Sequence, residues 1–126
     1  MRVLLDTNVV LDFLQEREPF VEDVAKLFEQ IDAGDIEGFI AAITITNIYY
    51  IVRKAAVIEA SEDAVTQILS DLQICTVDRA ILEQAMALSF RYFEDAVQYA
   101  CAIAYSVDAI VTAGAIILLG YIATSI

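Results

Sequence analysis

The chain contains no histidine, and this absence narrows the chemistry that it can perform. A nucleophile activated by histidine is excluded, and so is a zinc site with histidine ligands. The two cysteines, Cys75 and Cys101, lie in apolar contexts and lack the spacing of metal ligands. The first residues show no signal peptide, since Asp6 soon interrupts the apolar run that follows Arg2. We therefore expect buried, reduced thiols in a cytoplasmic protein.

Basic residues are scarce. Seven Lys and Arg residues oppose 19 Asp and Glu residues, which gives a net charge of −12. A protein that binds nucleic acid mainly through its own cations has the opposite balance. A polyanionic substrate would therefore need a bound metal ion or a local basic patch, and Arg53 and Lys54 are the only adjacent bases.

The end of the chain lacks charge altogether. Residues 109–126 form an uncharged stretch of eighteen residues in a chain that is 60% hydrophobic, with a mean hydropathy of +0.67. This length is the minimum for a transmembrane helix. Because glycine and hydroxyl residues interrupt the stretch and no Lys or Arg flanks it, we interpret it as two buried strands joined by a turn. Attachment to a membrane through residues 109–126 is kept as a weaker alternative.

Apolar runs and apolar periodicity predict alternating strands and helices in one domain over residues 1–126. The expected strands are 1–5, 38–41, 73–77, 107–112 and 116–122. The expected helices are 8–14, 21–31, 43–56, one beginning at Ser61-Glu62-Asp63, one from 78 to 89, and one opened by Glu94 and Asp95. Thr7 or Asn8 is expected to cap the first helix, Ser61 the fourth, and Asp78 the fifth. This order predicts an α/β fold: a three-layer α/β/α sandwich with a mainly parallel sheet of about five strands.

Several oxygen-bearing side chains are expected at one edge of that sheet. Ligands of open α/β sheets bind outside the carboxyl ends of the strands, where Asp6 and Thr112 are predicted to lie. Converging carboxylates bind Mg²⁺ or Mn²⁺, and the candidate ligands are Asp6, Thr7, Asn8, Asn47, Glu94, Asp95 and Thr112. Asp95 also has a structural explanation, since the helix dipole stabilises acids in a first turn. Asp6, at the end of a strand, has no such local explanation.

Three stretches of the chain carry a family resemblance. They are Leu5–Asp12 with Arg17–Phe20, then Ile45–Lys54, then Phe93–Ala100. In this order and spacing they resemble the PIN domain of the toxin type found in bacterial toxin–antitoxin pairs, over residues 1 to about 112. The resemblance implies a ribonuclease that hydrolyses RNA phosphodiester bonds with Mg²⁺ or Mn²⁺, and it implies an antitoxin partner and a homodimer.

The resemblance also assigns roles. Asp6 and Asp95 match two metal-binding acids of the family. Asn47 would add an amide oxygen or orient a water molecule, and Thr112 would bind phosphate or a water ligand of the metal. No membrane is implied.

The chain departs from the family pattern at three places. Asn47 stands where many PIN domains have glutamate, and Tyr92 replaces the first acid of Asp-Phe-Glu-Asp-Ala. After Thr112, the usual Thr-Arg-Asn-x-x-Asp-Phe is lost, and Ile117 takes the position of the acid. Two expectations therefore remain: a metal-dependent ribonuclease, or a PIN fold that has lost catalysis and acts as a binding or interaction module.

Overall fold

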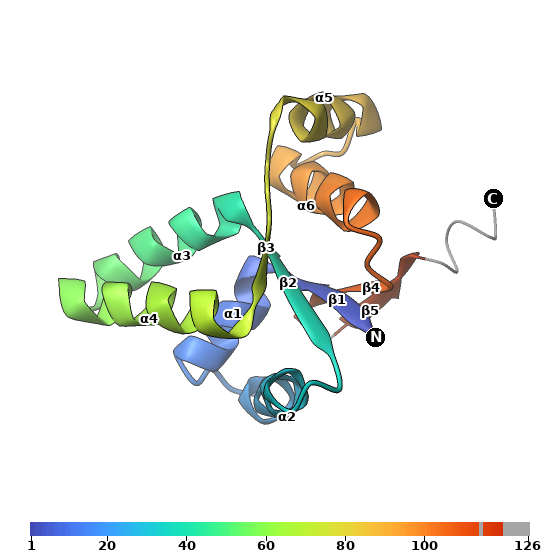
Figure 1. The fold of residues 1–126 in the computed structure, drawn as a ribbon. Coiled ribbons are helices and arrows are strands. Elements are labelled where there is room, and N and C mark those ends of the chain that lie inside the picture. The colour runs from blue at the N-terminus through green and yellow to red at the C-terminus, as the bar shows by residue number, and fades with distance from the viewer. Residues whose placement is uncertain (114, 120–126) are drawn as a thin grey trace.

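The computed structural model describes residues 1–113 and 115–119, in which pairs of helices separate the first four strands and the fifth strand follows the fourth directly (Figure 1). The strands are β1 (Arg2–Leu5), β2 (Glu37–Ala41), β3 (Gln73–Cys75), β4 (Ala109–Thr112) and β5 (Ala115–Leu118). The helices are α1 (Thr7–Leu14), α2 (Val21–Asp32), α3 (Ala42–Ala55), α4 (Ile58–Asp71), α5 (Arg79–Leu88) and α6 (Phe93–Ala104). The predicted alternation of elements is confirmed over this part of the chain.

The strands of the described part form one sheet in the order β3-β2-β1-β4-β5. The first four strands in that order are parallel, and β5 runs antiparallel to β4. The predicted mainly parallel sheet is therefore confirmed. Because β1 lies between β2 and β4, the chain leaves β1 in one direction along the sheet and returns on its other side. A crevice forms at such a reversal, outside the carboxyl ends of the strands.

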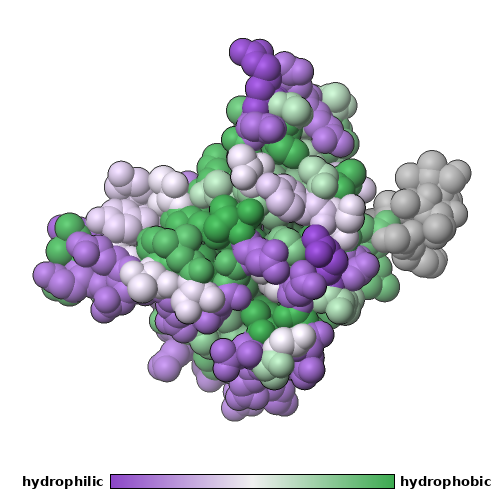
Figure 2. Space-filling view, viewed as in Figure 1, coloured by the Kyte–Doolittle hydropathy of each residue, from purple (hydrophilic) through white to green (hydrophobic). Residues whose placement is uncertain are grey.

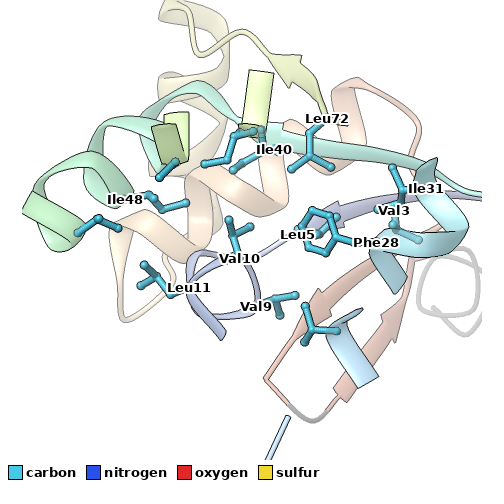
Figure 3. Close-up of a cluster of buried hydrophobic side chains, with 14 of the residues drawn as sticks. Val3, Leu5, Val9, Val10, Leu11, Phe28, Ile31, Ile40, Ile48 and Leu72 are labelled. Atoms are coloured by element: carbon cyan, nitrogen blue, oxygen red, sulfur yellow. The ribbon is translucent and has the colours of Figure 1, made fainter. Parts of the chain in front are cut away.

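Two apolar cores cover the two faces of the sheet. Successive side chains of a strand point to opposite faces. Val3 and Leu5 pack with α1, α2, α3 and α4, whereas Leu4 packs with α5 and α6. Figure 3 shows the first core, where Leu5 lies between Val10 of α1 and Phe28 of α2. Full burial of one such side chain contributes about 1.5–3 kcal/mol. The predicted three-layer sandwich is thus confirmed.

The outer surfaces of the helices carry many polar residues, although some large apolar side chains, such as Leu69 of α4 and Met86 of α5, are also exposed. In Figure 2, hydrophilic residues gather over α2, α4 and α5, and apolar surface lies toward the centre of the view, near the strands. This distribution is what a two-faced sheet requires, since each helix presents one apolar stripe to it.

The predicted helix caps agree with the structure at Asp78 and differ at the starts of α1 and α4. Asp78 caps α5, and its carboxylate accepts a hydrogen bond of 3.0 Å from the Ile81 N–H. The cap of α1 is Asp6, not Thr7 or Asn8, because Asp6 is the last extended residue before the helix. α4 begins at Ile58, so the predicted cap at Ser61 is wrong. Ser61 is buried one turn inside the helix, where packing outweighs its local capping preference.

The carboxyl-terminal prediction is only partly correct. β4 and β5 pair as adjacent strands, but every residue of β5 is exposed because it forms an edge of the sheet. The expected burial of this second strand is therefore wrong for residues 116–118 but correct for Leu119, which packs in the core with Leu4. Residues 120–122 of the prediction lie outside the described residues. Across the described ranges, no helix has the length and apolar character needed to cross a bilayer.

Candidate functional site

Most of the predicted ligands line one polar hollow of about 470 Å³, which we call the Asp6 hollow. It lies at the carboxyl end of β1, the central strand on whose two sides β2 and β4 were added in opposite directions along the sheet. Its lining comes from α1, α3 and α6, and consists of Asp6, Thr7, Asn8, Asn47, Tyr50, Ile51, Lys54, Glu94, Asp95 and Gln98. The fold therefore brings together side chains that are separated by more than 80 positions in the sequence.

Asp6 is held by two donors. Its Oδ1 accepts hydrogen bonds from the Thr7 N–H at 2.7 Å and from Gln98 Nε2 at 3.0 Å. The first bond caps α1, so Asp6 has the local structural explanation that its strand-end position did not suggest. Because both donors use the same oxygen, Oδ2 has no protein donor among the described residues and is available to a cation.

Glu94 connects three helices. Its Oε1 accepts hydrogen bonds from Thr7 Oγ1 at 3.2 Å and from Asn47 Nδ2 at 3.1 Å. The carboxylate, in the first turn of α6, is thereby joined to the start of α1 and to α3. It also sets the orientation of the Asn47 amide, whose nitrogen faces Glu94 and whose oxygen remains as an acceptor.

Asp95 lies in a field of negative charge. Its pKa is raised, first by loss of hydration and then by the negative charges of Asp6 and Glu94. Like charges in one hollow disfavour the ionised carboxylate, and a cation placed among them would reverse this effect. Among the described residues that line the hollow, Lys54 is the only basic one.

The oxygen atoms of the Asp6 hollow suit a hard cation as ligands, but they do not surround one. Over residues 1–113 and 115–119, no group of three or more acidic or cysteine side chains is arranged to hold a metal ion. Two carboxylates, Asp6 and Asp95, and the Asn47 amide oxygen provide oxygen ligands only. Such a set fits Mg²⁺, which usually binds one or two carboxylates and keeps several waters, and it also fits Mn²⁺.

Thr112 is not part of this hollow. It ends β4, whose Val111 is the register partner of Leu5, but it lines a separate hollow beside α2. Its proposed role at a phosphate or a metal water stays a prediction. Ile117, at the position where the family has an acid, lies in the exposed edge strand β5.

Sequence reasoning missed Gln98, which is only 4% exposed and directly contacts Asp6. One signal was available, because Gln98 follows Glu94 by four residues and so lies on the same face of α6. Tyr50 and Lys54 also line the hollow. The sequence identified Lys54 only as one of two adjacent bases, and it did not place Tyr50 at this site.

Comparisons with known proteins agree with this architecture. A family model for the PIN domain matches residues 2–114. Among the curated proteins, none matches the chain.

Two solved structures have the same fold. VapC20 from Mycobacterium tuberculosis, described as a toxin that cleaves the Sarcin–Ricin loop, has a TM-score of 0.70 at 11% identity, with 86% of each chain covered. VapBC2 from Rickettsia felis, solved bound to a DNA fragment from its promoter, has a TM-score of 0.63 at 17% identity, covering 89% of this chain and 87% of the other. At these identities the likeness establishes the fold. The family match over residues 2–114 establishes that the chain belongs to the PIN-domain family.

Proposed function

We propose that this protein is a ribonuclease of the toxin type that depends on Mg²⁺ or Mn²⁺, with Asp6 and Asp95 as the metal-binding carboxylates. The observation that carries the proposal is the convergence of Asp6, Asn47 and Asp95 in one hollow outside the carboxyl end of β1. The raised pKa of Asp95, caused first by loss of hydration and then by the charges of Asp6 and Glu94, is consistent with this grouping.

The remaining side chains have distinct tasks in this proposal. Gln98 and the Thr7 N–H orient Asp6, and Glu94 orients Asn47 so that its amide oxygen faces away from the Glu94 carboxylate. When bound, a divalent ion supplies positive charge against an RNA phosphate and lowers the pKa of a water molecule. Lys54 adds a positive charge at the rim, and the exposed Tyr50 ring offers a surface on which a base stacks.

The biological setting is proposed on the same family grounds. We infer a cytoplasmic toxin that is paired with an antitoxin protein and forms a homodimer. The likeness to VapBC2 and to VapC20, which is described as a toxin, supports the antitoxin partner. The net charge of −12 also favours a basic protein partner over free RNA.

The test compares the wild type with Asp6→Asn on single-stranded RNA in Mn²⁺ or Mg²⁺. An asparagine oxygen still caps α1 and still accepts from Gln98, so the variant is expected to fold while its negative charge is lost. Asp63→Asn, an exposed acid on α4, is the control. Metal-dependent cleavage that disappears only in Asp6→Asn supports the enzyme. Equal cleavage by all three proteins would point to a contaminating nuclease and refute the assignment.

A second function is favoured by a specific observation: within the described residues, no group of three acids is arranged to hold a metal. Ile117, which stands where the family has an acid, lies in β5 and does not line the Asp6 hollow. A PIN fold retained as a binding module would show no cleavage by the wild type and no Mn²⁺ binding in electron paramagnetic resonance titrations. Mn²⁺ binding that Asp6→Asn weakens, without cleavage, would mean that the metal site persists in an inactive protein.

A further inference from the structure

A second hollow of about 830 Å³ lies between α2 and the last two strands, and we call it the α2–β5 hollow. Val3, Val111 and Ile116 contribute to it from neighbouring strands, in a part of the sheet where Val111 and Ile116 are register partners. Apolar residues of α1 and α2 and of the segment before α2 also line it, namely Val9, Phe20, Val24 and Leu27. Ile116 is 65% exposed, so this apolar surface is open to solvent in the described structure.

The hollow contains one buried carboxylate with an oxygen atom that has no partner among the described residues. Asp12 of α1 lines it and is only 5% exposed, and its Oδ2 has no hydrogen-bond partner among the described residues. No ion pair to Asp12 is formed within those residues either. A buried carboxylate without a donor is costly, and each such group in a folded protein calls for an explanation.

The chemistry of a suitable ligand follows from these two features. The Asp12 carboxylate favours a ligand with a cationic hydrogen-bond donor. The apolar lining favours a ligand in which apolar groups flank that donor. A guanidinium suits the site better than an ammonium, because it is less strongly hydrated and its planar fork matches a carboxylate. The charges at the rim, Asp23, Lys26 and the Met1 terminus, do not pair with Asp12 in the described structure.

We propose that the α2–β5 hollow is a docking site for a segment of a partner protein that inserts an arginine toward Asp12 between apolar side chains. A protein segment is favoured because the hollow is large and the chain is strongly acidic, so a basic partner is attracted to it. The terminal torsion of an aspartate is broad, so the Asp12 carboxylate turns readily toward a docked guanidinium. The site uses none of the acids of the Asp6 hollow and is independent of the proposed ribonuclease activity.

The probe is the peptide acetyl-Leu-Arg-Leu-Leu-amide, compared with the same peptide carrying citrulline in place of arginine. Citrulline keeps the shape of the side chain and removes its charge. Dissociation constants and the location of binding are read from ¹H–¹⁵N NMR titrations of the wild type and three variants: Asp12→Asn, Asp23→Asn at the rim, and Asp6→Asn in the other hollow.

We expect the arginine peptide to bind the wild type about tenfold more tightly than the citrulline peptide, which corresponds to roughly 1.4 kcal/mol. This preference should disappear in Asp12→Asn and persist in Asp23→Asn and Asp6→Asn, with shifts at α2 and β5 in the wild type. Equal binding of the two peptides, no binding, or loss of the preference in Asp6→Asn would overturn the proposal. If Asp12→Asn does not fold, the wild-type shift map and the two other variants still decide the question.

Discussion

Replacing Asp12 by leucine is expected to make the protein more stable. Most substitutions at a buried position destabilise, because they remove contacts or open a cavity. Asp12 is an exception because its Oδ2 is buried without a donor among the described residues, and the neighbouring side chains in the hollow are largely apolar. Leucine has the same branched arrangement of four side-chain heavy atoms and buries no polar atom, and its larger methyl groups adjoin the hollow that Asp12 lines.

The size of the effect follows from the burial. Leaving a charged group buried and unsatisfied costs about 1–3 kcal/mol or more, so its removal should recover an amount of that order. Leucine also favours a helix over aspartate by roughly 0.5 kcal/mol, and Asp12 lies inside α1. For a chain of this size 1 kcal/mol corresponds to about 4 °C in Tm, so Asp12→Leu should raise Tm by roughly 4–12 °C.

The assay is thermal unfolding by circular dichroism, with urea unfolding as a second measurement. Asp12→Asn removes the charge but keeps a polar group, so its Tm should lie between those of the wild type and Asp12→Leu. Asp23→Asn is the matched control, since Asp23 borders the same hollow but is exposed, and its change should stay within about 0.5 kcal/mol. A lower Tm for both Asp12 variants would show that Asp12 has a stabilising partner in solution, and the reasoning would then fail.

Three further outcomes follow from the structure. Gly38→Ala should destabilise by about 1–3 kcal/mol in urea unfolding, because its Cβ would lie 2.6 Å from Leu72 Cδ2 and 2.8 Å from Ile31 Cδ1; an unchanged midpoint would contradict this. Burial raises the pKa of the Cys75 thiol to about 12 and that of Cys101 to about 11, so a disulfide reagent at pH 8 should label neither in the native state and both after unfolding. Asp6→Asn should lower the pKa of Asp95 in a carboxyl ¹³C NMR titration, because one of the charges that raise it is removed; the pKa should stay constant in Asp63→Asn.

The sequence was most informative where a pattern is local and repeated. Apolar periodicity located the helices and the parallel strands, because each buries one stripe or face against a neighbour. It was least informative at positions decided by tertiary contacts. Ser61 carries the signature of a helix cap, yet it is buried inside α4, and the apolar run at β5 predicted burial although β5 lies at an edge. The partners of Asp6 depended on how α6 packs against β1, so Gln98 was not identified as one of them.

Asp6 caps a helix and is also the proposed metal ligand, and this combination affects how such a site can be recognised. A capping aspartate normally has a sufficient structural explanation, and that argument alone would dismiss it as a ligand. Here the cap and the Gln98 contact both use Oδ1, so the cap orients the carboxylate and leaves Oδ2 free of protein donors within the described residues. Because asparagine preserves the capping oxygen and removes only the charge, stability and metal binding are separable at this position. A loss of Mn²⁺ binding in Asp6→Asn at unchanged Tm would therefore be evidence about the site and not about the fold.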